Sequence, residues 1–193
     1  DALPICRLRD FIATAADSDI QFDFRLSDIF GTVNVYFEGL GGAHIPQVIN
    51  NAASVLAGQQ FPVKVVVIQI GGNDIADWTD HETLANHVVS AAEYIHLGLG
   101  VDQVVISQLF FRDFSLVPDY NNIVHRVNFA ISRKIAHYEG NHVVLWRHSG
   151  FWALEARTLI MLPDGVHFND IGNEKYYKSL KSCLVQALKR ALN

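Results

Sequence analysis

The sequence is poor in cysteine and has no excess of positive charge. Only two of its 193 residues are cysteines, Cys6 and Cys183, and they lie near opposite ends of the chain. They form neither a disulfide framework nor a C-x-x-C metal cluster, and the histidines lack ligand spacing, so we expect no metal and no cofactor. A net charge of −5 leaves no basic surplus to neutralise a phosphate backbone, which argues against nucleic acid as a partner.

Long hydrophobic runs are missing as well. The longest apolar stretches, such as VVVIQI, are strand-sized and fall far below the roughly 20 residues that a membrane helix needs. No basic segment followed by an apolar run opens the chain, so we expect no signal peptide in it, while a processed export signal stays compatible with it. These absences predict a soluble protein without a membrane partner and leave its compartment open.

The chain is nevertheless rich in apolar residues, which make up 50% of it. That fraction suffices for a sizeable core, and the length suits one domain, so we expect a single domain over residues 1–193. Apolar, β-branched runs predict strands over 32–37, 64–70, 102–110 and 141–147. Helical spacing predicts helices over 46–58, 80–97, 118–138 and 173–192.

This alternation of strands and helices predicts an α/β fold, a three-layer α/β/α sandwich around a parallel sheet. Three of the four strand runs are nearly continuous, as in strands that are buried on both faces. Ligands bind such sheets beyond the carboxyl ends of the strands, so the segments that follow the strands are where chemistry is expected.

Polar and glycine-rich stretches follow three of these strands: EGLGGAHIP, GGNDIADW and, after the last strand, LPDGVHFND. Backbone N–H groups at glycines and the Asn73 side-chain amide can bind an oxyanion, and Asp164 can fix the tautomer of His167. Taken alone, a D-G turn with a histidine before a helix is more often a capped loop, and Asn73 or Asp74 could cap the next helix.

Together these stretches resemble the SGNH hydrolases, also called GDSL esterases and lipases. The matching parts are G-G-N-D at 71–74 and D-G-V-H-F-N at 164–169, with a weaker match, G-L-G-G-A-H, at 39–44. The resemblance implies a flavodoxin-like sheet of about five parallel strands in the order 2-1-3-4-5. It also implies that His167 is the general base, that Asp164 orients it, and that Asn73 and the backbone N–H of Gly42 form the oxyanion hole. The GLGG run leaves the register at Gly42 open.

The nucleophile of that family is missing from this chain. The family's serine belongs to a G-D-S-L-like block at the end of its first strand, whereas this chain begins DALPICRLRDFI. Alignment on Asp1 and Leu3 places Ala2 at the position of the serine, and alanine fits a space made for serine. Counting back from Leu8 places Leu3 there instead.

Three other serines are alternatives for the nucleophile. Ser18 mimics the D-S pair but follows a helical pattern, and Ser149 follows the last predicted strand, where the family has no nucleophile. Ser107 lies inside a predicted strand and is expected to be a packed hydroxyl. We therefore keep Ala2 as the nucleophile position.

The strand that precedes the family's serine block is also missing, and it lies inside the sheet. Its absence would leave neighbouring backbone groups unpaired, at about 1–3 kcal/mol for each buried group. We therefore expect either residues upstream of this sequence or another segment of the chain to fill that gap.

The resulting hypothesis is an SGNH-type ester hydrolase that acts on a small-molecule ester or an acylated carbohydrate. Because its serine is absent, we expect the esterase activity of this chain to be weak or nil. The alternative is a non-catalytic binding module, or pseudoenzyme, of the same fold. Phe110, Phe111 and Arg112 follow the third predicted strand and either border a substrate pocket or belong to the core. Trp146, Phe151 and Trp152 are expected to pack or to line the pocket wall.

Overall fold

The computed structural model describes residues 24–76, 79–113, 115–137, 140–152 and 158–192. Within these ranges, three parallel strands form a sheet in the order β1-β2-β3: Val65–Ile68, Gln103–Ser107 and Val143–Trp146. Val66 of β1 lies opposite Val104 of β2, and Ile106 of β2 lies opposite Leu145 of β3. Every residue of the central strand β2 is buried, as its continuous apolar run predicts.

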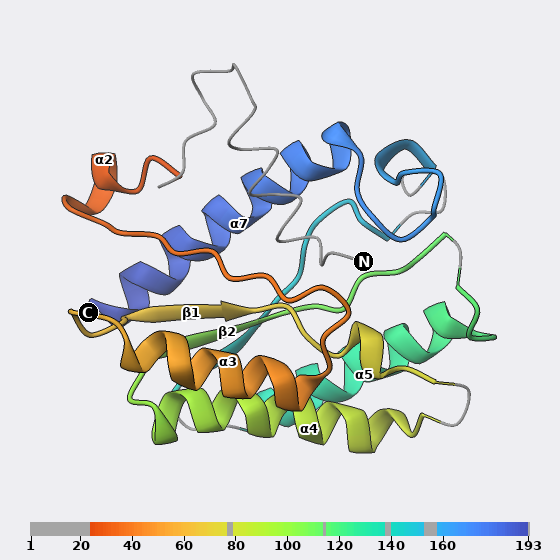
Figure 1. The fold of residues 1–193 in the computed structure, drawn as a ribbon, viewed down its shortest axis with the longest axis horizontal. Coiled ribbons are helices and arrows are strands. Elements are labelled where there is room, and N and C mark those ends of the chain that lie inside the picture. Colours follow the sequence, from red (N-terminus) through yellow and green to blue (C-terminus); the bar gives the residue numbers. More distant parts are fainter. Residues whose placement is uncertain (1–23, 77–78, 114, 138–139, 153–157, 193) are drawn as a thin grey trace.

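Helices cover both faces of this sheet (Figure 1). Helix α7 lies on one face, and α3, α4 and α5 lie on the other. The bounds are Ile45–Ala57 for α3, His81–Glu93 for α4, Tyr120–Ile135 for α5 and Asp170–Ala191 for α7. A short helix α2, Ser27–Phe30, precedes them, and a π-helical turn, Tyr94–Gly98, extends α4. The predicted three-layer α/β/α architecture is confirmed.

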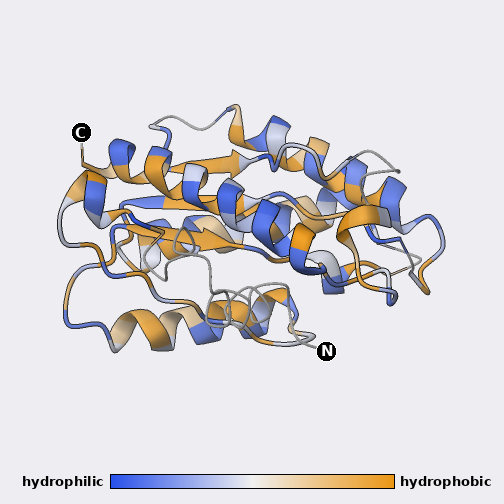
Figure 2. Cartoon of the chain, turned by 90° about the horizontal axis from the view of Figure 1, so that it is seen from above, coloured by the Kyte–Doolittle hydropathy of each residue, from blue (hydrophilic) through white to orange (hydrophobic). Residues whose placement is uncertain are grey.

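Alternate residues of β2 build the two halves of the core. Val104 and Ile106 pack in the cluster that α4 and α5 complete, whereas Val105 packs with Cys183 and Ala187 of α7. Figure 2 shows mostly apolar colour on the strands and a mixture of apolar and hydrophilic colour along the helices. No helix within the described ranges is both long and apolar enough to cross a membrane.

The prediction of a strand over 32–37 is wrong. This segment runs drawn out alongside the sheet, but it pairs with no strand in the described part of the chain (Figure 1). A β-branched run becomes a strand only when a neighbouring backbone lies about 4.8 Å away and supplies the ladder. The described sheet therefore has three strands and not the expected five or so.

The loops that follow the strands depend on local backbone geometry. Gly71, in the loop that follows β1, has φ of 97°, and a Cβ there would lie 3.2 Å from Cγ2 of Val88. Glycine is thus the residue that lets the chain turn sharply against α4. Asn169 caps α7 by accepting a hydrogen bond of 3.0 Å from the N–H of Gly172, so the helix begins three residues before the predicted start.

Candidate active site

His167 and Asp164 form a hydrogen-bonded pair just before α7. Nδ1 of His167 lies 2.8 Å from Oδ2 of Asp164, and the side chain of His167 is only 10% exposed against 43% for that of Asp164. Both residues lie in the turn that Gly165 allows with its φ of 66°. The predicted acid–histidine contact is present, and it assigns the proton of the pair to Nδ1.

The Asp164 carboxylate is held ionised. Burial would raise the pKa of Asp164, but the N–H groups of His167 and Val166 each donate to Oδ1 at 2.9 Å, and the His167 ring contacts Oδ2. Together these hydrogen bonds lower the pKa of Asp164 from 3.8 to about 2. The carboxylate is therefore negative at neutral pH.

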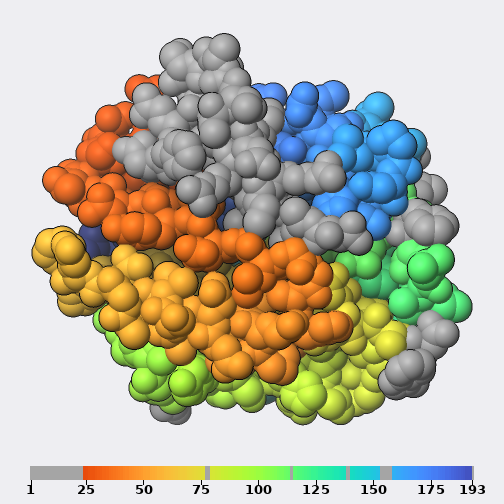
Figure 3. Space-filling view, viewed as in Figure 1, coloured from red at the N-terminus to blue at the C-terminus, as the bar shows by residue number. Residues whose placement is uncertain are grey.

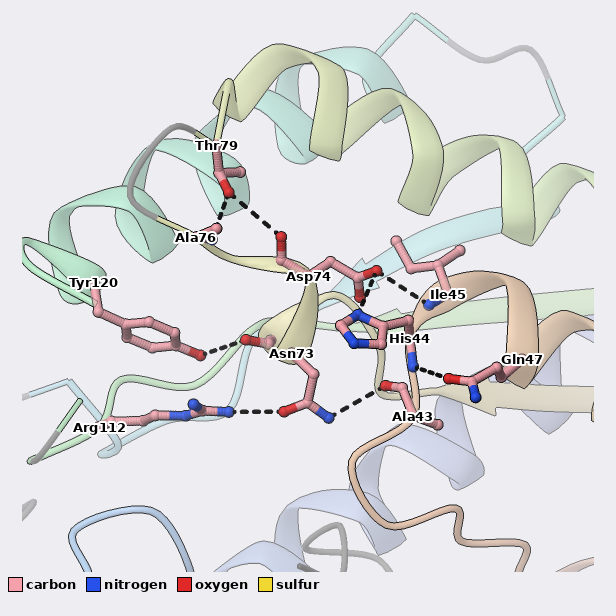
Figure 4. A network of polar contacts seen from close by, with 11 residues as sticks. Ala43, His44, Ile45, Gln47, Asn73, Asp74, Ala76, Thr79, Arg112 and Tyr120 are labelled. Carbon is pink, nitrogen blue, oxygen red and sulfur yellow. Dashed lines mark hydrogen bonds and ion pairs between the residues drawn. The ribbon is translucent and has the colours of Figure 1, made fainter. Parts of the chain in front are cut away.

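Asn73 lies in the short 3₁₀ turn Gly72–Asp74 that follows β1, between two partners from other loops (Figure 4). Its Nδ2 donates to the carbonyl of Ala43 at 3.2 Å, and its Oδ1 accepts from Nη2 of Arg112 at 3.0 Å. A guanidinium can only donate, so this contact fixes which end of the Asn73 amide carries the NH₂ group. One of the two amide hydrogens then remains for a further acceptor.

Helix α5 holds the segment that carries Arg112. The Asn121 side chain makes two hydrogen bonds to the Arg112 backbone, accepting from its N–H at 2.9 Å and donating to its carbonyl at 2.7 Å. Asn128 holds Leu109 in the same way, with both bonds at 2.9 Å. The Arg112 guanidinium also lies 4.6 Å from the ring centre of Tyr120. The backbone after β2 is thus fixed at two points, and Arg112 reaches Asn73 from a rigid base.

Two hydrogen bonds connect these loops at one edge of the sheet. The N–H of Asp113, next to Arg112, donates to the carbonyl of Gly165 at 2.8 Å, which joins the Arg112 segment to the His167 loop. On the other side, Arg112 contacts the Asn73 side chain, which in turn donates to the carbonyl of Ala43 and so reaches the glycine-rich loop. Gly42 in that loop is exposed and has φ of 65°. The loops carrying four of the predicted site residues are therefore linked in one chain of contacts.

Asp74 has a structural role other than capping the next helix, which was the alternative reading of this segment. Its Oδ1 lies 3.3 Å from the N–H of Ile45 and 3.3 Å from Nδ1 of His44, so it binds the start of α3 and not the helix that follows it (Figure 4). The helix that follows, α4, is capped by Asp80, which accepts from Thr83 N–H at 2.8 Å. Asp74 thereby anchors the glycine-rich loop against the Asn73 turn.

A buried polar network lies at the same ends of the strands, and its role was not apparent from the sequence. His148, which follows β3, is fully buried between two hydroxyls, with Nε2 2.7 Å from Ser107 and Nδ1 2.8 Å from Ser179. Ser107 also hydrogen-bonds the Gln69 side chain, and Trp146 Nε1 donates to Ser179 at 3.1 Å. Burial lowers the pKa of His148 from 6.5 to about 3. The prediction that Ser107 is a packed hydroxyl is confirmed.

The remaining residues that the sequence singled out lie at the surface, in or against the core, or outside the described residues. Ser149 is exposed, while Phe151 is buried in the core and the partly buried Phe110 packs against it with ring centres 5.1 Å apart. Phe111 and Trp152 stack edge to face at 4.7 Å. Ala2, Leu3 and Ser18 lie outside the described residues. The contact of Arg112 with Asn73 was not predicted from the sequence, although an arginine in the segment that follows a buried strand was a usable signal.

Two of the solved structures that are similar to this chain match it over most of its length. One is a member of the lipolytic protein G-D-S-L family from Veillonella parvula, at 18% identity and TM-score 0.63, covering 88% of this chain and 91% of that one. The other, from Streptococcus pneumonia, is named as a candidate platelet activating factor, at 16% identity and TM-score 0.64, covering 93% and 90%. No protein-family model matches the chain, and no curated protein matches it. The chain therefore has the fold of the G-D-S-L lipolytic proteins.

Proposed function

We propose that this chain is an ester hydrolase of the SGNH or GDSL type whose nucleophilic serine is absent, with Ala2 in its place. The observation that carries the proposal is the 2.8 Å pair of His167 and Asp164 on a loop tied to the segment that orients Asn73. Its substrates are small acyl or acetyl esters, including acylated carbohydrates. Neither nucleic acid nor a membrane is proposed as a partner.

The chemistry assigns one step to each side chain. A serine at position 2 attacks the ester carbonyl while Nε2 of His167 takes the hydroxyl proton, and the same proton then goes to the alcohol oxygen as its bond to the acyl carbon breaks. Water repeats the sequence on the acyl-serine and releases the acid. Asp164, ionised because its pKa is about 2, stabilises the imidazolium that forms in each step.

The oxyanion that forms in these steps needs hydrogen-bond donors. Asn73 offers the amide hydrogen that Ala43 does not use, and Arg112 keeps the amide from flipping. The backbone N–H of Gly42 is the second donor in this proposal. In serine hydrolases one such donor contributes about a hundredfold to a thousandfold in kcat.

The test is a rescue of activity with p-nitrophenyl acetate. Ala2→Ser, in a chain extended N-terminally by a β-strand that holds the new serine, is expected to hydrolyse the ester at least about a hundredfold faster than the same chain with Ala2. His167→Ala in the rescued chain is expected to remove this gain. Leu3→Ser tests the other register, and Ser18→Ala tests the D-S pair at 17–18.

A surface histidine provides the matched control, because exposed imidazoles react slowly with this substrate. His125 lies on the exposed side of α5, so His125→Ala is expected to leave the rescued rate unchanged. If neither Ala2→Ser nor Leu3→Ser hydrolyses any short-chain ester while the protein stays folded, the hydrolase proposal is wrong. The fold would then serve as a binding module.

A further inference from the structure

Two histidines meet at the end of the sheet where the strands begin, away from the candidate active site. His96, in the π-helical turn after α4, and His142, directly before β3, lie with ring centres 4.6 Å apart and ring planes 12° from parallel. Both border a hollow of about 480 Å³, which Gln103, the first residue of β2, also lines. The loop with Asn73 instead follows the end of β1. The histidine pair is therefore separate from the residues proposed to act on esters.

The figures show where this hollow lies. In Figure 1 the ends of α4 and α7 lie on the left, whereas the arrow of β1 points to the right. Figure 3 shows the dark blue end of α7 at the surface on the left of the same view. Ala191, in the last turn of α7, lines the hollow. The hollow is therefore at the surface of the molecule, within reach of a small solute.

His96 is held with its lone pair on Nε2. Its Nδ1 lies 2.7 Å from the carbonyl oxygen of Val101, and a carbonyl can only accept, so Nδ1 carries the proton. Histidines that bind metals donate their other ring N–H to a backbone carbonyl in the same way, which fixes the tautomer and the orientation of the ring. The turn itself is also held, because the N–H of Gly100 donates to the carbonyl of His96 at 3.1 Å. His96 is thus preorganised as a ligand.

A buried glutamine fixes the backbone that carries His142. Nε2 of Gln103, which is 3% exposed, donates to the carbonyl of Asn141 at 3.0 Å and to that of His142 at 2.9 Å. The N–H of Val104 donates to the same carbonyl of His142 at 2.8 Å. The ring of His142 is exposed, and its nitrogens make no hydrogen bond to a described residue. It can therefore turn about its Cβ–Cγ bond until its lone pair and that of His96 point at one ion.

The charges around the hollow favour a cation on balance. Asp102 lines the hollow, and the carbonyls of the last turn of α7 carry partial negative charge beside it. Lys64 pairs with one oxygen of Asp102 at 2.6 Å. Arg190, exposed on α7, is the positive group that opposes a cation there. A metal ion can use the imidazole lone pairs, whereas an anion cannot, so Arg190 provides a way to tell the two occupants apart.

Two imidazoles also select the class of metal. Imidazole suits Zn²⁺, Cu²⁺ and Ni²⁺, with Cu²⁺ bound most tightly, whereas Mg²⁺ and Ca²⁺ prefer oxygen ligands. The described ranges contain no group of three or more His, Cys, Asp or Glu side chains arranged to hold a metal, so water has to complete the coordination. We propose that His96 and His142 together bind one divalent transition-metal ion, Cu²⁺ or Zn²⁺. The expectation of no metal rested on spacing in the sequence, which does not connect residues from two separate elements.

Cu²⁺ alone tests the site in the chain as it stands. Electron paramagnetic resonance of the first equivalent is expected to show coupling to two imidazole nitrogens, and this pattern is expected to be lost in both His96→Ala and His142→Ala. Titration calorimetry is expected to show that each variant raises the Kd for Cu²⁺ at least about tenfold. His96→Ala also loses the hydrogen bond to Val101, so if it fails to fold, the exposed position His142 decides the question.

Two further variants serve as controls. His87→Ala removes an exposed histidine from α4 and is expected to leave the Kd for Cu²⁺ unchanged. Arg190→Gln removes a positive charge beside the ion, so it is expected to lower this Kd about threefold or more at low salt. An anion in the hollow would respond to Arg190→Gln in the opposite direction.

The proposal is overturned if His142→Ala binds Cu²⁺ as tightly as the parent chain and keeps the spectrum of two nitrogens. It is equally overturned if His167→Ala, and neither variant of the pair, abolishes binding, because the metal would then lie at the candidate active site. Binding of inorganic phosphate that Arg190→Gln weakens, with no binding of Cu²⁺ to the pair, would show that the hollow is an anion site. Failure of the esterase rescue would leave all these outcomes unchanged.

Discussion

Acidification is expected to destabilise the fold through His148, which is buried without charge. The hydrogen bonds around the His148 ring suit its neutral form. Trp146 donates to the Ser179 hydroxyl, which can in turn donate to Nδ1 of His148. Nε2–H of His148 can donate to Ser107, whose hydroxyl can donate to the Gln69 side chain. A second ring proton on Nδ1 would leave the Ser179 hydroxyl hydrogen without this acceptor. Both the burial and the network therefore oppose protonation in the folded state.

The magnitude follows from the difference in pKa between the two states. His148 titrates near 6.5 in the unfolded chain and near 3 in the fold, so between these values the unfolded state binds one more proton. His148 therefore does not reduce the free energy of unfolding above about pH 6.5. Below that pH, the free energy of unfolding falls by about 1.4 kcal/mol per pH unit. From about pH 7 to about pH 4.5 the loss amounts to about 2.5 kcal/mol, a large part of the 5–15 kcal/mol that holds an ordinary domain together.

The assay is urea unfolding, followed by circular dichroism, at several pH values across this range. His148→Gln removes the titrating group, so its free energy of unfolding is expected to fall less steeply with acidification by about 1.4 kcal/mol per pH unit, even though its stability at neutral pH is lower. His125→Gln, which removes an exposed histidine, is expected to keep the full slope. Parallel slopes for the parent chain and His148→Gln would refute the reasoning.

Three further predictions concern the site and its supporting helix. In the chain rescued by Ala2→Ser, Asp164→Asn is expected to lower kcat about a thousandfold or more, because the Nδ1–H tautomer loses its carboxylate. It is also expected to lower stability at neutral pH, because the lowered pKa of Asp164 means that the fold favours its ionised form; steady-state kinetics and urea unfolding measure the two effects. Arg112→Leu in the same background is expected to lower kcat by up to about a hundredfold at little change in KM, with Arg112→Lys recovering part of it; equal loss in both variants would show that the contact with Asn73 does not orient the amide. Gly172→Ala is expected to destabilise the fold by about 1–3 kcal/mol in urea unfolding, because its Cβ would clash with the carbonyl oxygen of Ile160; an unchanged midpoint would contradict this packing.

The three strands of the sheet, which helices cover on both faces, were predictable from the sequence. The runs at 64–70, 102–110 and 141–147 became β1, β2 and β3, each somewhat shorter, because a continuous β-branched run has few other ways to bury its side chains. The contact of His167 with Asp164 was equally accessible, since the two residues are three apart and one turn brings them together. The local sequence is sufficient to predict a contact where the two residues are close neighbours in the chain.

Pairing and burial were decided only by the tertiary structure. Residues 32–37 have the composition of a strand but lack a neighbouring backbone in the described fold, and a ladder depends on that neighbour and not on the run itself. Arg112 meets Asn73 across 39 positions, and His148 meets Ser107 across 41, so no spacing rule could connect them. The sequence by itself determined which segments are apolar and which short turns bear an acid and a base. The packing of α5 and α7 against the sheet determined which distant polar groups meet, because hydrogen bonds form only between groups that the fold brings within about 3 Å of each other.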